Sequence, residues 1–334
     1  MSVFTPVDLQ ELDPWLATHA VGTVKTLTPI AEGVENTNYF LDTSDGRFVL
    51  TLFERLEPAD LPFYLGLMHV LAEHQVSAPK PFADRHGQLF SPLCGKPAAL
   101  VSRLPGKPVE SPTPAHCAAI GRWLAEMHRA LADFQPAIDN PRGAIWRATT
   151  AAQIHPFLSD ESRALLDDNL QKIDGDATCG ALPRGIIHAD LFRDNALWRD
   201  AEGAELSGVI DFYFAGVDDW LFDLAVAAND WCQNDDGSAL DGGRCSALLD
   251  AYHAIRPLGA DEKAAWPTTL ARAALRFWLS RLADQFLPRP GDLVKIKNPD
   301  EYRAILLNRR ALIDNPSAAP WLSENTGNTA VTAR

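Results

Sequence analysis

Four polar residues in the second half of the chain have the types and the spacing that phosphoryl transfer requires. His188, Asp190 and Asn195 form a His-x-Asp-x-x-x-x-Asn motif, and Asp211 follows an apolar run further along the chain. In magnesium-dependent phosphoryl transfer, one carboxylate orients the acceptor hydroxyl and takes its proton, while an amide and another carboxylate hold the metal. We therefore expect Asp190 to orient the acceptor, His188 to brace the loop, and Asn195 and Asp211 to bind Mg2+.

Apolar segments beside these residues predict the strands that would position them. Residues 185–187 and 196–198 flank the motif, and residues 208–210 lead into Asp211. The competing interpretation is a turn rich in Asp and Asn, whose side chains cap backbone groups between buried strands. Residue frequencies alone would produce such a motif about 0.03 times in a chain of this length, so we favour the functional interpretation. Asp223 precedes an apolar run and is expected to be a helix N-cap.

The composition predicts a globular protein of two lobes and argues against two classes of partner. The chain has 334 residues, 46% of them hydrophobic, which is enough to bury a sizeable core. Its formal net charge is −14 at pH 7. Nucleic acids and anionic membranes favour clustered Lys and Arg, so neither is expected to be the main partner. An anionic nucleotide would have to be bound locally, by metal and backbone N–H groups.

Cysteine spacing and the N-terminal sequence predict a cytoplasmic protein. The five cysteines show no paired spacing and no Cys-x-x-Cys, so neither a disulfide framework nor a zinc site is expected. They are Cys94, Cys117, Cys179, Cys232 and Cys245. The N-terminus lacks a basic region followed by an apolar one, and no stretch is long enough to span a membrane.

Five segments of the chain resemble known kinases of small molecules. They are residues 33–40, 48–54, 188–195, 210–215 and 229–232. The motif and the segment at Asp211 are similar to the catalytic and metal loops of the aminoglycoside phosphotransferase and choline kinase superfamily, relatives of the protein kinases. Within that superfamily, the resemblance is closer still to the bacterial homoserine kinases of this kinase-like type. It covers nearly the whole chain, to about residue 315.

The resemblance implies an α+β, two-lobed protein-kinase-like fold. Residues 1–103 would form a nucleotide-binding lobe with a small antiparallel β-sheet, and residues 104–314 a larger, mainly helical lobe for catalysis and substrate binding. The hydrophobic pattern itself predicts a hairpin over residues 39–53 and helices at residues 60–75, 115–132, 160–173, 242–255, 262–287 and 299–313. Residues 315–334 are polar and aperiodic, and we expect this tail to be disordered.

The resemblance also implies a reaction and its cofactors. As a phosphotransferase with an alcohol group as acceptor, the protein would use ATP and Mg2+ to phosphorylate the side-chain hydroxyl of L-homoserine. The product would be O-phospho-L-homoserine, an intermediate of threonine biosynthesis. The partner is therefore expected to be a small-molecule amino acid, with no nucleic acid and no membrane. No oligomeric state is predicted.

Residues of the first lobe are expected to bind the nucleotide, as the resemblance implies. The loop before the hairpin would cover the phosphates, and the backbone of residues 102–104 would pair with the adenine edge. The predicted nucleotide-binding residues are Gly33, Asn36, Thr37, Asn38, Thr51, Ser102 and Leu104. Taken alone, the loop is more typical of an ordinary polar hairpin turn.

Thr51 departs from the pattern of the superfamily. Most relatives carry at this strand position a Lys that contacts the α- and β-phosphates, whereas the homoserine-kinase-like group shares the substitution. The departure supports the narrower resemblance and puts the usual phosphate contact in doubt. Arg55 or Lys80 could supply the charge instead.

A zwitterionic acceptor needs an anion for its ammonium group and a cation or amide cluster for its carboxylate. The predicted substrate-binding residues are Arg142, Arg193, Asn229, Asp230 and Trp231. Asp230, with its two neighbours, is expected to meet the ammonium group, and Arg193 or Arg142 the carboxylate. The alternative is that these are solvated polar residues at the ends of secondary structure.

Other functions remain open at the level of sequence. Choline, methylthioribose or an aminoglycoside could be the acceptor; choline would require an aromatic cage, and an aminoglycoside an acidic cleft. A protein of a different class, a catalytically inactive regulator that binds nucleotide, would explain the missing Lys. The intact Asp190, Asn195 and Asp211 argue against that class.

Overall fold

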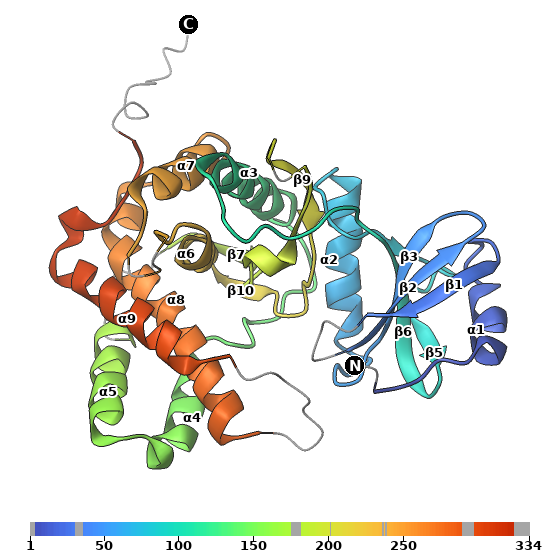
Figure 1. Ribbon diagram of the computed structural model, residues 1–334, viewed down its shortest axis with the longest axis horizontal. Coiled ribbons are helices and arrows are strands. Elements are labelled where there is room, and N and C mark those ends of the chain that lie inside the picture. The colour runs from blue at the N-terminus through green and yellow to red at the C-terminus, as the bar shows by residue number, and fades with distance from the viewer. Residues whose placement is uncertain are drawn as a thin grey trace, which may run out of the picture. The chain divides into compact units, whose positions relative to one another are not determined.

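The structure divides the chain into two compact units. It is a computed structural model that describes residues 4–30, 36–174, 182–200, 202–235, 237, 239–288 and 297–323 (Figure 1). The first unit, here called the sheet unit, contains the chain up to Pro105 together with Gly208–Ile210. The second, the helical unit, contains Gly106–Ser207, the chain from Asp211 to Pro290, and the C-terminal part. The division at Pro105 lies close to the lobe boundary expected at residue 103.

The described part of the sheet unit is an antiparallel sheet in the order β1-β2-β3-β6-β4, with β5 also paired to β6. The strands are β1 (Val24–Pro29), β2 (Thr37–Thr43), β3 (Arg47–Leu52), β4 (Pro81–Phe82), β5 (Ser91–Leu93) and β6 (Lys96–Ser102). Two helices accompany them, α1 (Leu9–Leu16) and α2 (Leu61–Glu73). The predicted hairpin is confirmed, because β2 and β3 pair with Tyr39 opposite Leu50.

Alternation along the strands gives this sheet two different faces. Tyr39, Leu41 and Leu50 are buried in one core with residues of α1, including Leu12 and Leu16. Successive side chains of a strand point to opposite faces. The even-numbered residues of β2 and their partners on β3 therefore belong to the other face, which α1 does not cover.

The helical unit contains most of the helices and two short strand pairs. Its helices are α3 (Pro114–Ala130), α4 (Ala144–Ile154), α5 (Asp160–Asp174), α6 (Trp220–Trp231), α7 (Gly242–His253), α8 (Ala260–Phe286) and α9 (Pro299–Asp314). The strands are β7 (Arg184–Ile187), β8 (Ala196–Asp200), β9 (Glu205–Val209) and β10 (Gly216–Asp219), with β7 paired to β10 and β8 to β9. The last two residues of β9 belong to the sheet unit. The antiparallel sheet and the mainly helical part confirm the predicted fold class.

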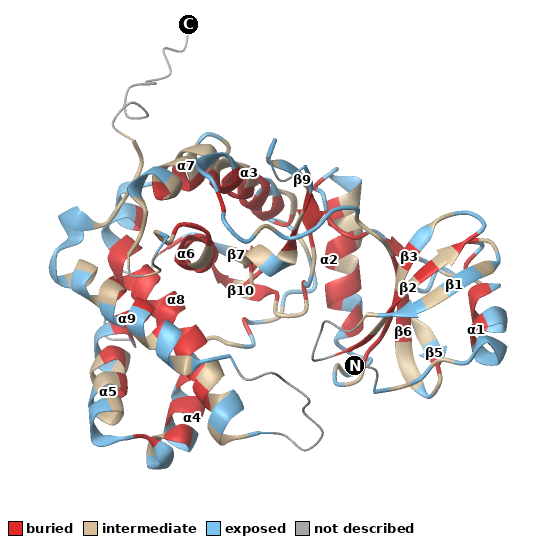
Figure 2. Cartoon of the chain, in the orientation of Figure 1, coloured by how far each residue is buried: buried red, intermediate tan, exposed pale blue. Residues whose placement is uncertain are grey.

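Helix α6 forms the centre of the helical unit. Nearly all of its residues are buried, and it packs against α8, whose residues 265–279 are all buried (Figure 2). Pro267 lies inside α8. Helix α4 was not predicted from the sequence. It begins at Gly143 without a side-chain cap and leaves Ile145 86% exposed, so both the capping signal and the apolar stripe are weak.

The C-terminal segment corrects one expectation. Residues 315–323 were predicted to belong to a disordered tail, but the Ser323 hydroxyl donates a hydrogen bond to Asp250, and the Trp266 indole N–H donates to the Pro320 carbonyl. The segment is therefore attached to α7 and α8. Residues 324–334 lie outside the described residues. In the part of the chain that the structure describes, no helix is both long and apolar enough to cross a membrane.

Candidate active site

Two aspartates of α6 hold the loop of residues 188–195. Asp223 and Asp230 are seven residues apart, which places them on the same side of an α-helix. The Asp223 carboxylate accepts hydrogen bonds from the backbone N–H groups of His188 (2.7 Å) and Ala189 (2.8 Å). Asp230 accepts from the backbone N–H of Arg193 at 2.8 Å. One rigid helix therefore fixes both ends of the loop.

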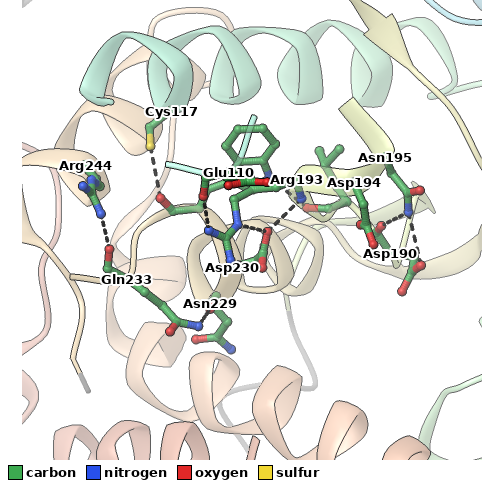
Figure 3. Close-up of polar contacts among 12 residues, drawn as sticks. Glu110, Cys117, Asp190, Arg193, Asp194, Asn195, Asn229, Asp230, Gln233 and Arg244 are labelled. Carbon is green, nitrogen blue, oxygen red and sulfur yellow. Dashed lines mark hydrogen bonds and ion pairs between the residues drawn. The ribbon is translucent and has the colours of Figure 1, made fainter. Parts of the chain in front are cut away.

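The far end of the loop has further contacts with α6. The Arg193 side chain donates to Asp230 through Nε (3.1 Å) and reaches the Glu110 carbonyl through Nη1 (2.6 Å), as Figure 3 shows. The indole N–H of Trp231 donates to the Leu191 carbonyl at 3.1 Å. Asp230 is only 13% exposed, so these hydrogen bonds are made largely out of water. Such charge-assisted bonds are stronger than neutral ones.

Ala189, inside the loop, has a backbone conformation that the hydrogen bonds to Asp223 stabilise. Its φ is +66°, in the left-handed region that costs an L-residue other than glycine about 1–2 kcal/mol. The two hydrogen bonds to Asp223 fix the N–H of Ala189 itself and that of the preceding residue, His188. His128 Nε2 lies 3.0 Å from the Asp223 carboxylate, and Tyr252 OH lies 2.7 Å from His128 Nδ1.

The role expected for Asp223 is therefore corrected. The N-cap residue of α6 is Asp219, while Asp223 is buried inside the first turn of the helix. An Asp ahead of an apolar run suits either position, and the sequence alone does not separate them. The carboxylate is directed to the loop because the helix begins before it.

Asp190 is held more loosely than Asp230. Asn195 donates its side-chain N–H to the Asp190 carbonyl (2.8 Å) and to Oδ2 of the same residue (3.3 Å), and Figure 3 shows the amide turned back toward it. On the other side, Arg276 Nη1 of α8 lies 3.6 Å from Asp190 Oδ1. Burial raises the pKa of the Asp190 carboxyl above its ordinary value, and the Arg276 charge opposes that shift. A carboxylate has about four acceptor sites, so capacity remains for a hydroxyl.

His188 connects the loop to the segment that carries Asp211. Its ring is fully buried, and its centroid lies 4.9 Å from that of Phe212 and 6.3 Å from that of Trp123. The Asp190 backbone N–H donates to His188 Nδ1 at 3.3 Å. Since Phe212 follows Asp211 directly, the histidine contacts both parts of the predicted site. Asp211 is exposed, with φ at +66°.

The donor atoms of Asn195 and Asp211 fit Mg2+. Both partners of the Asn195 side chain are oxygens of Asp190, so the amide must present its nitrogen to them and its carbonyl oxygen elsewhere. An amide oxygen and a carboxylate are hard ligands of the kind that Mg2+ prefers, with phosphates and water completing its shell. Among the described residues, no group of three or more His, Cys, Asp or Glu could hold a metal, and a site with two protein ligands needs no such group.

The substrate-binding residues expected on α6 require revision. Asn229 is fully buried; its amide N–H donates to the Leu270 carbonyl and its oxygen accepts from Arg309 Nε. Trp231 is also fully buried. Asp230 and Arg193, which were expected to bind opposite ends of a zwitterion, bind each other. Trp231 and Asp230 thus bond to the loop, whereas Asn229 bonds to α8 and α9, and none of these side chains is well placed to meet substrate.

Arg142 lies near the segment that follows Asp211, whereas Arg276 was not predicted from the sequence. The guanidinium carbon of Arg142 lies 4.7 Å from the ring centroid of Trp146 and 5.6 Å from that of Phe214, three positions after Asp211. Arg276 is 3% exposed. The sequence did contain a signal for Arg276, because Arg272 and Arg276 interrupt an apolar helix at a spacing of four. Charges buried in this way require specific partners.

The face of the sheet that α1 leaves uncovered carries Asn38 and Thr51. These residues are opposite each other on β2 and β3, and the Thr51 hydroxyl donates to Asn38 Oδ1 at 2.8 Å. At the position where most relatives place a Lys, this chain therefore has a hydrogen bond between two neutral side chains. Arg103 lies on the same face, with its guanidinium carbon 3.8 Å from the Phe40 ring centroid. It joins Arg55 and Lys80 as a candidate cation.

Two side chains of the predicted nucleotide site serve the fold. The Thr37 hydroxyl donates to Glu54 and accepts from the backbone of Phe4 and Thr5. The Ser102 hydroxyl accepts from the Lys80 N–H. A direct phosphate contact by either hydroxyl is therefore disfavoured.

The predicted nucleotide-binding residues also include Asn36, Leu104 and Gly33. Asn36 is buried, and its side-chain oxygen has no hydrogen-bond partner among the described residues. Within residues 102–104, Ser102 and Arg103 donate their N–H groups to the carbonyls of Lys80 and Arg47, so Leu104 is the better candidate for pairing with adenine. Gly33 lies outside the described residues.

Comparison with known proteins places these features in context. A model of the phosphotransferase enzyme family matches residues 26–258. A protein named homoserine kinase from Methylobacillus flagellatus is 49% identical over 306 residues, which cover 92% of this chain and 94% of the relative. A protein of the same name from a Janthinobacterium species is 46% identical over 309 residues, covering 92% and 95%.

Solved structures show the same fold at low sequence identity. The amicoumacin kinase hAmiN, in complex with AMP-PNP, Ca2+ and Ami, matches with a TM-score of 0.66 and 17% identity, covering 93% of this chain and 94% of that one. A microcompartment-associated aminopropanol kinase matches with a TM-score of 0.58 and 16% identity, covering 95% and 99%. At these identities, the likeness concerns the fold alone.

Proposed function

Because this chain belongs to the phosphotransferase enzyme family, we propose that it transfers the γ-phosphoryl group of ATP to the side-chain hydroxyl of L-homoserine. The observation that carries the proposal is Asp190, a largely buried carboxylate bonded to Asn195 within a loop that α6 holds at both ends. A transfer with a loose transition state requires accurate positioning more than covalent chemistry. The proposed acceptor agrees with the name of the relatives that share 46–49% of their residues with this chain.

In this proposal each polar residue of the loop has one task. Asp190 accepts a hydrogen bond from the homoserine hydroxyl, aims its oxygen at the phosphorus, and takes the proton as the O–P bond forms. Asn195 keeps that carboxylate in place and, with Asp211, would hold Mg2+. The metal, when bound, neutralises charge on the phosphates. His188 and Asp223 fix the loop backbone.

The nucleotide part of the proposal concerns the sheet face with Asn38 and Thr51. Because Thr51 is neutral, the charge of the phosphates would be met by metal, backbone N–H groups and a cation from another position. Arg55, Lys80 and Arg103 are the candidates. We expect Ala substitution of the residue that serves to raise the KM for ATP, with the KM for homoserine nearly unchanged. If all three Ala variants keep the wild-type KM for ATP, none of these residues meets the charge of the phosphates.

The test of the proposal is ADP release by the purified protein with ATP and Mg2+. L-homoserine is compared at equal concentration with choline, methylthioribose, kanamycin and L-serine. We expect clear preference for homoserine, with O-phosphohomoserine identified as the product. Preference for another alcohol would refute the acceptor while keeping the reaction type. ATP binding without turnover of any of them would favour a regulator. A cytoplasmic location stays a prediction.

A further inference from the structure

Arg276 is a buried cation beside the proposed base. It comes from the middle of α8, is 3% exposed, and places Nη1 3.6 Å from Asp190 Oδ1. Its guanidinium carbon stacks 3.8 Å from the centroid of the Phe277 ring. Stacking fixes the plane of the guanidinium, and the fork of N–H donors then points in a set direction.

A second arginine approaches the same aromatic ring from another part of the chain. Arg276 lies 5.5 Å from the Phe214 centroid, and Arg142 lies 5.6 Å from it. Arg142 is half-buried in a loop that is fixed to β10, because Asn140 bonds Val217 and Asp218 and also receives the Arg142 N–H. Phe214 is half-buried as well. Two guanidiniums of different exposure thus flank one ring close to the base.

The dimensions of the acceptor match this arrangement. Its hydroxyl must come within about 2.6–3.2 Å of the Asp190 carboxylate. Three carbon atoms separate the hydroxyl oxygen of homoserine from its carboxylate carbon, so the two groups are about 5 Å apart in an extended chain. Arg276, which contacts Asp190, is within that reach, and Arg142, near the same Phe214 ring, is the more exposed of the two arginines. Guanidiniums bind carboxylates through two parallel hydrogen bonds.

Building on the proposed function, we propose that Arg276, which is stacked on Phe277, and Arg142 bind the α-carboxylate of homoserine beside the Phe214 ring. This subsite replaces the one expected at Arg193, which is occupied by Asp230. It would make the protein prefer hydroxylated amino acids to amino alcohols that lack the carboxylate. Arg276 would then both contact the base and bind the substrate that the base activates.

The test compares L-homoserine with 3-aminopropan-1-ol, which is the same molecule without the carboxylate. We expect the wild-type protein to favour homoserine in kcat/KM by about 100-fold or more. Arg142→Gln and Arg276→Gln should each reduce this preference by about 10- to 100-fold. Arg276→Lys keeps the charge without the fork and should give an intermediate preference. Arg281→Gln is the matched control on α8, since Arg281 pairs with Glu301, and it should leave the preference unchanged.

The outcomes distinguish this subsite from the proposed function. If the wild-type protein does not phosphorylate homoserine, the function fails before any variant is needed. If it does, and Arg142→Gln and Arg276→Lys keep the full preference over 3-aminopropan-1-ol, the subsite is refuted. Loss of activity on both alcohols in equal proportion would also refute it, because that result indicates a structural role. Circular dichroism and thermal unfolding identify a variant that fails to fold. If the variants of Arg276 do not fold, the preference measured for Arg142→Gln tests the subsite.

Discussion

At each end of the 188–195 loop an aspartate lies beside an arginine, and the contacts of the two pairs differ in length. Asp230 accepts from the backbone N–H and the side chain of Arg193, at 2.8 and 3.1 Å. Asp190 has Arg276 at 3.6 Å and the Asn195 amide at 3.3 Å. Burial raises the pKa of both carboxyls, and in both the arginine opposes the shift.

The difference separates a structural carboxylate from a reactive one. Asp230 is occupied by hydrogen bonds within the protein and defines the position of the loop. Asp190 is largely withdrawn from water, yet its hydrogen bonds are long and leave acceptor sites for a substrate hydroxyl. The same pair of residue types therefore serves two purposes, and four substitutions can test that distinction.

The largest effect is expected for Asp190→Asn. The amide cannot take the proton of the acceptor, so kcat should fall by about 100- to 10,000-fold, while ATP affinity stays within about threefold. Steady-state ADP release and equilibrium binding of a nucleotide measure the two quantities. Retention of more than a tenth of the activity would remove Asp190 from the role of base.

Asp223→Asn should have the next largest effect. The variant turns an N–H2 group toward one of the two loop N–H groups, which leaves the left-handed conformation of Ala189 less well supported. We expect kcat to fall by about 10- to 100-fold and the free energy of unfolding to fall by about 1–3 kcal/mol. Urea unfolding with kinetics on the same samples gives both numbers. An unchanged kcat with reduced stability would limit Asp223 to a structural role.

Asp230→Asn should affect stability more than chemistry. Combined with Arg193→Gln in a double-mutant cycle, it should show a coupling energy of about 1–3 kcal/mol in unfolding free energy. We expect kcat to fall by less than about tenfold, because the base itself is unchanged. A loss of activity as large as that of Asp190→Asn would contradict the contrast between the two aspartates.

Asp194→Asn is the exposed control within the same loop. Asp194 pairs with Lys297 at 3.5 Å, and both side chains are more than 60% exposed. Exposed pairs contribute little, so the free energy of unfolding should change by no more than about 0.5 kcal/mol. Thermal unfolding at low and high salt checks this value. A larger change would mean that charge alone, rather than burial, sets the behaviour of the loop.

The sequence was sufficient for the features that depend on local pattern. The hairpin around residues 44–47 and the longer helices follow from hydrophobic periodicity and were found within a few residues of their ends. The motif from His188 to Asn195 identified the family, and the comparisons confirm it. These signals are contained in neighbouring residues, so no knowledge of tertiary contacts was needed.

The remaining features depend on which side of a helix faces the site. Asn229 and Trp231 are next to Asp230 in sequence, yet their side chains enter the core of the helical unit. Arg276 lies far from the loop in sequence and reaches it only because α8 packs on α6. Such contacts arise from packing between distant segments, which hydrophobic periodicity does not specify.

The most direct measurement is the initial rate of O-phosphohomoserine formation by the wild-type protein, Asp190→Asn and Asp230→Asn, at saturating ATP, Mg2+ and L-homoserine. The account predicts product from the wild type, a rate within about tenfold of it for Asp230→Asn, and a rate at least about 100-fold lower for Asp190→Asn. Equal rates for the two variants, or a faster Asp190→Asn, would contradict the assignment of Asp190 as the residue that activates the acceptor.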